Sequence, residues 1–470
     1  MSQTQVAAVT DDFAAADESA ERGHVVDGPV LSTIVRLATP TVLVLVAQSL
    51  VGVAETWYVS FLGGDALAGA SLVFPIIMLM TMMSNGGLGS GVASAVARAL
   101  GAGRREDANA LVWHAVVLAI GAGIVFAVAA WLLGPALYRG LGGSGGALDA
   151  AVSYSHILFA GSIPIWIVNL LAAALRGAGD VRTPAKVTLV GSAIVVAASP
   201  ALIFGLGPIP AMGIAGAGLA TVLFYVGASA YLLRRLRREG LAVRLVRSRI
   251  DARLLGDVMR VGLPAAASTI QPNLTVIVVT GAVGAFGIQA IAGYGMASRL
   301  DYLLVPVLFG LGSAVLTMVG MSVGARAFER ARRIAWTGAA LGFAIAGGVG
   351  LIAAFAPTLW LNTFSSDPAL VEPGVSYLRR VAPAYGLFGA GFVLSFASQG
   401  AARVLWPFLA GTARLVIAAG LGWLAVHYLD ASMSTLFAIV GGSLVAFFAV
   451  IATALSAGTT LRRAPEGKNF

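Results

Sequence analysis

Long apolar runs alternate along the chain with short polar segments that contain glycine, proline and charged residues. A helix of about 20 apolar residues crosses a membrane core of about 30 Å, and twelve runs reach that length. The pattern therefore predicts an all-α membrane protein with twelve spans. Several runs are longer than the lipid requires, so tilted or protruding helices are expected. The predicted spans cover residues 36–60, 67–98, 108–137, 148–175, 184–206, 211–233, 254–285, 289–323, 329–356, 370–399, 406–428 and 431–457.

The second half of the chain repeats the first at a distance of about 224 residues. Residues 63–69 (GGDALAG), for example, return as residues 287–293 (GIQAIAG). The distance then shortens by one residue, because Gly101 matches Gly324. Each copy contains six predicted spans, so both copies begin on the same side of the membrane. The repeat predicts two six-helix lobes related by a pseudo-two-fold axis along the membrane normal.

The positive charges orient these spans. Of the 30 lysines and arginines, 25 fall in the two tails, in alternate loops or at the span ends beside them, and four fall within spans. Only Arg139 falls in the loops of the opposite side. Cytoplasmic loops of membrane proteins carry such an excess of positive charge, so both termini are predicted to be cytoplasmic. Abundant arginine beside scarce lysine is typical of a GC-rich bacterial genome, and the predicted location is the inner membrane of a bacterium.

The predicted spans divide the chain into five regions. They are a disordered cytoplasmic tail (1–29), an N-terminal lobe (30–233), a basic cytoplasmic linker (234–253), a C-terminal lobe (254–457) and a second cytoplasmic tail (458–470). The first tail is polar and acidic and lacks the apolar core of a signal peptide. The arginines of the linker are expected to rest on anionic lipid head groups.

Composition excludes several classes of protein. With 58% hydrophobic and 11% charged residues, the chain differs from soluble domains, which average about 25% charged residues. The lack of cysteine excludes disulfides, thiolate metal sites and thiol catalysis. The net charge of +9 is explained by the cytoplasmic loops, so nucleic acid is not an expected partner. A membrane-embedded transferase or hydrolase would need clustered acids, bases or metal ligands, and none is visible, so no catalytic residue, metal or cofactor is predicted.

Glu55 is the one acid deep within the apolar sequence of the first half. An acid at membrane depth costs roughly 2.5 kcal/mol or more and usually marks a transport pathway or a proton relay. Gln48 lies two helical turns earlier on the same face. We interpret Glu55 as a proton site, since a carboxyl group removed from water can exchange protons near neutral pH. The alternatives are a glutamate at the outer interface or one paired structurally with an arginine.

Several other polar side chains fall within the predicted spans. Asn169, Thr221, Ser199 and Tyr58 are candidates to line a cavity around Glu55. For any one of them alone, a hydrogen bond to a neighbouring helix or to its own backbone is the commoner arrangement.

Arg299 and Asp301 open the second span of the C-terminal copy. They are two residues apart and therefore point to different faces of a helix. A structural clamp and a gate remain equally open interpretations of this pair.

Taken together, these stretches resemble the multidrug and toxic compound extrusion (MATE) transporters, over nearly the whole chain after residue 30. The most specific element is the segment LRGAGDVRTP at residues 175–184. Others are residues 48–64, 101–104, 200–205 and 292–299. Within the family, the chain resembles the DNA-damage-inducible, proton-coupled branch.

The resemblance implies two six-helix lobes in a V shape and a central cavity. It also implies export of organic cations or other amphiphiles coupled to inward proton or sodium flow. Many bacterial members carry an Asp and a Gln where this chain has Glu55 and Gln48, and Asn169 and Thr221 look like further members of that polar network. Members with this network usually carry Asn and Asp in the fifth helix, where Val195 and Ser199 stand here.

We therefore expect a monomeric, lipid-embedded antiporter that exports amphiphilic, cationic small molecules in exchange for protons. Sodium is less favoured, because spans seven and ten contain no deep acid. The alternative is a flippase for a lipid or lipid-linked precursor of the same superfamily. A basic cavity lined by Arg299, Arg379, Arg380 and Arg414 would favour that alternative.

Overall fold

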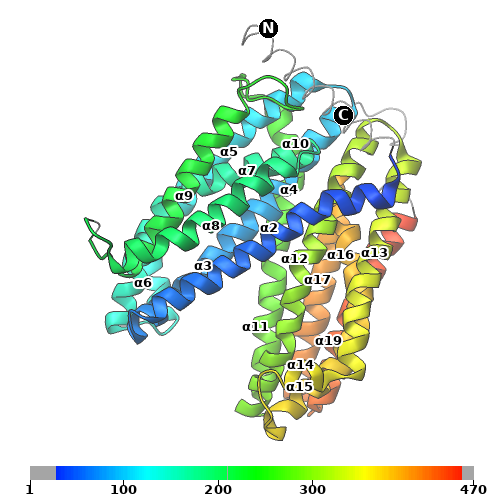
Figure 1. Cartoon of the computed structure of the whole chain (residues 1–470). Coiled ribbons are helices and arrows are strands. Elements are labelled where there is room, and N and C mark those ends of the chain that lie inside the picture. The colour runs from blue at the N-terminus through cyan, green and yellow to red at the C-terminus, as the bar shows by residue number, and fades with distance from the viewer. Residues whose placement is uncertain (1–27, 209, 458–470) are drawn as a thin grey trace. The chain divides into compact units, whose positions relative to one another are not determined.

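The computed structural model describes residues 28–208 and 210–457, and within these ranges the chain is mostly helical, with one long connection at residues 236–251 (Figure 1). Eleven helical segments are long and apolar enough to cross a membrane. The pair α6 and α7, bent by 51° at Gly161, supplies a twelfth span. The prediction of an all-α membrane protein with twelve spans is confirmed. The predicted tails lie outside the described residues, apart from residues 28 and 29.

Eight α-helices form the first six spans. The second span contains α3, a π-helical segment and α4, and the fourth contains α6 and α7. Their bounds are α2 Val30–Ser60, α3 Gly64–Met82, the π segment Met83–Leu88, α4 Gly89–Gly101, α5 Arg105–Gly140, α6 Gly145–Ala160, α7 Ser162–Gly177, α8 Arg182–Phe204 and α9 Ile214–Arg235.

The remaining spans follow the same order, with breaks at different places. Their bounds are α10 Ala252–Ser268, α11 Ile270–Gly284, α12 Ile288–Gly324, α13 Phe328–Phe355, α14 Pro357–Leu361, α15 Pro368–Val381, a 3-10 turn Ala382–Ala384, α16 Tyr385–Gly400, α17 Leu405–Leu415, a second π segment Val416–Leu421, α18 Gly422–Tyr428 and α19 Met433–Ser456.

The first of the two π segments explains the one-residue slip of the sequence repeat. The second span, Gly64–Gly101, has 38 residues, whereas its counterpart α12 has 37 and is a continuous α-helix. The fifth span, Arg182–Phe204, has 23 residues, and its counterpart Leu405–Tyr428 has 24 and contains the second π segment. A π turn takes up one extra residue within an α-helix. Each π segment therefore lies in the span that is one residue longer than its counterpart.

The chain divides into two compact units. The first contains residues 43–100 and 104–259, and the second contains residues 28–42, 101–103 and 260–457. The start of α2 thus packs with the second unit, where a Cβ on Gly310 would lie 3.2 Å from the Ala38 carbonyl oxygen. These units differ from the predicted lobes 30–233 and 254–457 mainly in the place of this first part of α2.

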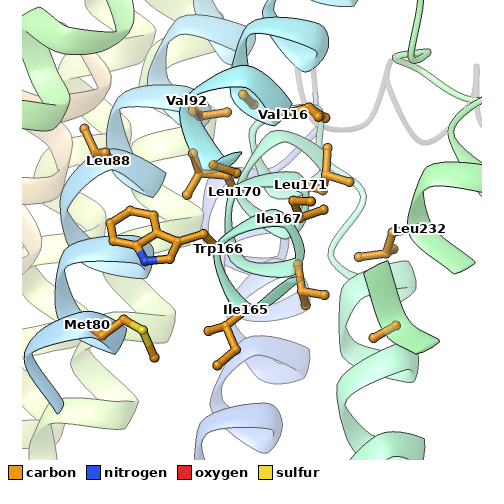
Figure 2. Packing of buried hydrophobic residues seen from close by; sticks show 14 of the residues in the cluster. Met80, Leu88, Val92, Val116, Ile165, Trp166, Ile167, Leu170, Leu171 and Leu232 are labelled. Atoms are coloured by element: carbon orange, nitrogen blue, oxygen red, sulfur yellow. The ribbon is translucent and has the colours of Figure 1, made fainter. Parts of the chain in front are cut away.

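The core of the first unit surrounds α7. Figure 2 shows Trp166 pointing from α7 toward the helical segments that carry Met80 and Leu88. Leu170 and Leu171 continue the same packing one turn later, and all five side chains are buried. The outward faces are apolar as well, as expected for helices in lipid: Leu132, for example, is 74% exposed.

The predicted linker is an ordered part of the first unit. Leu241 is buried, and the backbone amide of Arg244 donates to the side-chain oxygen of Asn109 on α5 at 2.7 Å. The backbone amide of Asp251 donates to Nε2 of the buried His114, also on α5, at 2.9 Å. These bonds hold the chain between the spans along α5. The contact of its arginines with lipid head groups stays a prediction.

Candidate functional site

Glu55 lies in the last third of α2 and contacts α9. The hydroxyl of Thr221 donates to Oε1 of Glu55 at 2.9 Å, and both side chains are half-buried. Across the described part of the chain, no arginine, lysine or histidine nitrogen lies within 4.0 Å of this carboxylate. Within the described residues Glu55 therefore has no basic partner, which argues against the alternative that it forms a structural ion pair. The carboxyl group is held by a neutral hydroxyl, which can donate a hydrogen bond to the carboxylate and can accept one from the protonated carboxyl group.

Two glycines let α9 lie close to the fourth span. A Cβ on Gly161, at the bend between α6 and α7, would lie 2.5 Å from Cγ2 of Val222. A Cβ on Gly218 would lie 3.3 Å from the ring of Tyr154 on α6. Because neither position has a side chain, α9 packs against this bend, and Thr221 on the same helix is held in place.

Two tyrosines belong to the surroundings of Glu55 but were not predicted. Tyr154 and Tyr225 lie within electrostatic range of its carboxylate. Tyr225 follows Thr221 by one helical turn, and this spacing is a signal that sequence reasoning could have used. Tyr154 is on another span, and its sequence position gives no such signal.

Tyr58 connects α2 to α8 through a carbonyl group that proline leaves free. Its hydroxyl donates to the Val196 carbonyl oxygen at 3.1 Å. In an α-helix that oxygen would accept from the amide four residues later, but residue 200 is a proline and has no N–H. A free carbonyl at membrane depth needs another donor. Tyr58 supplies it one turn after Glu55, which fixes α2 against α8.

Replacing Tyr58 with phenylalanine is expected to destabilise the protein by about 1–2 kcal/mol, because the Val196 carbonyl loses its donor. In a Pro200→Ala background the new amide can bond that carbonyl, so the same substitution should cost less than about 0.5 kcal/mol. A double-mutant cycle of unfolding free energies in detergent measures the difference. Equal costs in the two backgrounds would contradict this role of Pro200.

The other predicted cavity residues do not bond Glu55 directly. The Asn169 amide donates to the Ser84 hydroxyl at 2.7 Å and so joins α7 to the π segment of the second span. Ser199 is fully buried, and its hydroxyl has no hydrogen-bond partner among the described residues. Gln48 is half-buried, and no hydrogen bond joins it to Glu55 within the described ranges. The structure thus brings Thr221 to Glu55 and places Tyr58 beside them.

Arg299 and Asp301 point to different partners, as their spacing predicts. The guanidinium of Arg299 lies 5.5 Å from the ring centroid of Phe364. The carboxylate of Asp301 accepts hydrogen bonds from Tyr377 and Tyr385. Both residues belong to the second unit, whereas Glu55 belongs to the first. Over residues 28–208 and 210–457, no group of three or more His, Asp or Glu side chains is arranged to hold a metal ion.

Comparison with known proteins places this architecture in a family. The sequence model of the MatE family matches residues 40–201 and 264–424, one stretch in each half of the repeat. The chain belongs to the MatE family. Members of this family are transporters rather than enzymes, so the chain is a multi-pass membrane transporter of small molecules.

Several named proteins are similar to this chain over most of their length. The probable multidrug resistance protein YoeA of Bacillus subtilis is 29% identical over 354 residues, which are 74% of this chain and 76% of that protein. The probable multidrug resistance protein NorM of Thermotoga maritima is 29% identical over 346 residues, 72% and 73% of the two chains. A FAD transporter of Shewanella oneidensis is 25% identical over 408 residues, 84% and 88% of the two chains.

Solved structures of MatE-type transporters have the same fold. A MOP superfamily transporter from Pyrococcus furiosus, described as having a binding pocket of reverse polarity, superposes with a TM-score of 0.84 at 26% identity and covers 94% of this chain and 98% of its own. A crystal structure of MATE in complex with MaD3S superposes with a TM-score of 0.83 at 25% identity, over 93% and 98% of the chains. The predicted family and the two-lobe helical fold are confirmed, whereas the proton-coupled branch stays a prediction.

Proposed function

We propose that this MatE transporter exports amphiphilic, cationic small molecules across the bacterial inner membrane in exchange for protons, by alternating access. Both termini are taken to lie in the cytoplasm, and the chain is taken to act as a monomer. The observation that carries the proposal is the Glu55 carboxyl group at membrane depth, held by the Thr221 hydroxyl at 2.9 Å.

A carboxylate in this position attracts a cation and can also take up a proton. Protonation removes the negative charge, so it weakens the hold on a cationic substrate at the same place. A proton that enters from outside can therefore displace the substrate, and loss of the proton toward the cytoplasm restores the site. Sodium is the less favoured coupling ion. Within the described residues, the Thr221 hydroxyl is the one side-chain oxygen that bonds Glu55, whereas a bound metal cation usually takes about six oxygen ligands.

Everted membrane vesicles test this proposal. Respiration acidifies their interior, and addition of ethidium, a monovalent organic cation, should discharge the proton gradient as the dye enters the vesicle. The discharge should persist in sodium-free buffer and should be absent from vesicles without the protein. No discharge across a broad panel of organic cations, or a strict need for sodium, would contradict proton antiport.

A second candidate function is transport of an anionic or lipid-linked substrate. Arg414 is half-buried in the second unit, and its guanidinium lies 5.0 Å from the ring centroid of Phe388. The similar FAD transporter and the transporter of reverse pocket polarity also point toward this class. Vesicles that move a fluorescent lipid-linked anion but no organic cation would favour the flippase over the antiporter.

A further inference from the structure

A second buried carboxyl group lies in the second unit, far along the chain from Glu55. Asp301 is in the middle part of α12 and is half-buried. The hydroxyl of Tyr377 donates to its Oδ2 at 2.7 Å, and the hydroxyl of Tyr385 donates to its Oδ1. Both tyrosines are 2% exposed. Each oxygen of the carboxylate therefore has its own buried hydroxyl donor.

The two tyrosines lie on opposite sides of a break in one span. Tyr377 belongs to α15, and Tyr385 begins α16. Between them the chain makes the 3-10 turn Ala382–Ala384, which includes Pro383. Proline has no N–H and interrupts the helical hydrogen bonds at this point. The Asp301 carboxylate thus bonds both of the helical segments that the 3-10 turn connects.

Few charges face this carboxylate. On α12 itself Tyr294 and Tyr302 lie within electrostatic range, and on α17 Arg414 does. No arginine, lysine or histidine nitrogen comes within 4.0 Å of it in the described portion of the chain. The charge of Asp301 is therefore stabilised mainly by two hydroxyl groups.

The elements packed on α12 add little to this electrostatic environment. Neither α11 nor α14 contains a titratable side chain, and the charged residues of α13 lie in its first two turns. On α15, Glu372 and Arg379 are exposed, and Arg380 bonds Ser376. The ring of Phe437 on α19 packs against Tyr377 and Tyr294 and contributes no charge.

We propose that Asp301 is a second proton-exchanging group of the transport cycle, so that two protons move for each substrate molecule. This inference rests on the proposed proton antiport. A proton taken up by the carboxylate forms one new O–H bond and breaks no other covalent bond. The protonated oxygen becomes a donor, so the tyrosine that donated to it must turn away or accept instead. One half of the broken span is then released, and the span can bend at Pro383.

Membrane potential distinguishes two protons from one in proteoliposomes that contain the purified full chain. Exchange of two protons for one ethidium cation moves net charge, so wild-type transport should respond to a potassium diffusion potential set with valinomycin. Asp301→Asn should leave an exchange of one proton for one cation. This exchange moves no net charge, so its rate should not change with the membrane potential. Asp301→Glu should restore the response. A wild type that ignores the potential, or an Asp301→Asn variant that responds like wild type, would overturn the inference.

Hydrogen exchange on the wild-type chain supplies a second test that needs no transport and no variant. After correction for intrinsic rates, lowering the pH should raise amide exchange in residues 377–390 by about tenfold or more, since a bond to a charged group is lost. A pH-independent rate in this segment would overturn the role of Asp301. If ethidium is not transported at all, the proposed antiport fails, and this measurement still decides whether Asp301 titrates and releases the span.

Discussion

Glu55→Gln is expected to abolish proton-driven export while leaving the protein folded. Glutamine keeps the size and can still accept from Thr221, which donates at 2.9 Å in the wild type, but it cannot gain or lose a proton. A difference of one pH unit across the membrane supplies about 1.4 kcal/mol per exchanged proton, enough for about tenfold accumulation. The variant should lose this whole gradient, and everted vesicles should show ethidium distributed passively.

Glu372→Gln is the matched control for this experiment. Glu372 is an exposed acid at the start of α15 and undergoes the same chemical change. It should leave ethidium accumulation and the accompanying proton release at the wild-type level. Full coupled transport by the Glu55 variant would move the proton site elsewhere, and equal losses in both variants would point to a general effect of removing an acid.

A second large effect is expected where α13 and α16 pack through glycine. A Cβ on Gly342 would lie 2.7 Å from the Gly389 carbonyl oxygen, and a Cβ on Gly389 would meet the Gly342 carbonyl oxygen. Small residues allow such close backbone approach in membrane helices. Gly342→Leu should therefore push the two helices apart and destabilise the second unit by about 3 kcal/mol or more. Thermal unfolding of the purified protein in detergent measures the loss.

Gly348→Leu provides the comparison within the same helix. Gly348 is exposed, and a Cβ there would meet no atom within 4 Å. The two variants insert the same leucine six residues apart, so they differ in packing and not in helix propensity. The control should unfold within a few degrees of the wild type. Similar losses in both variants would mean that glycine flexibility, and not close packing, is what this helix requires.

The spans could be predicted from the sequence because lipid imposes a simple rule on them. Each membrane helix needs a long apolar run, and the predicted bounds, such as 289–323 for α12 (Ile288–Gly324), agree with the structure within a few residues. The bend at Gly161 was not predicted, because the apolar run continues through it. The one-residue slip of the repeat was visible, but sequence alone does not say that a π turn accommodates it.

The candidate site was predictable where one helix or the family resemblance connects its members. The charge of Glu55 marks it within an apolar span, and the family resemblance indicates Thr221 as a member of its network; in the structure the Thr221 hydroxyl donates to Glu55. The partners of Asp301 could not be found in this way. Tyr377 and Tyr385 are 76 and 84 residues away along the chain, and no helical period links residues on different spans. Only the packing of α15 and α16 against α12 brings them together.

The π segments bear on how duplicated halves can diverge. In an α-helix one inserted residue turns everything beyond it by about 100°, which would carry lipid-facing side chains into the protein interior. A π turn absorbs the residue locally and spares the rest of the span that reorientation. In each case the span with the π segment has a counterpart in the other half that is one residue shorter and has no π segment. Insertions confined in this way let the two halves of the repeat specialise separately. The corresponding span of the other half still shows the helix without the extra residue.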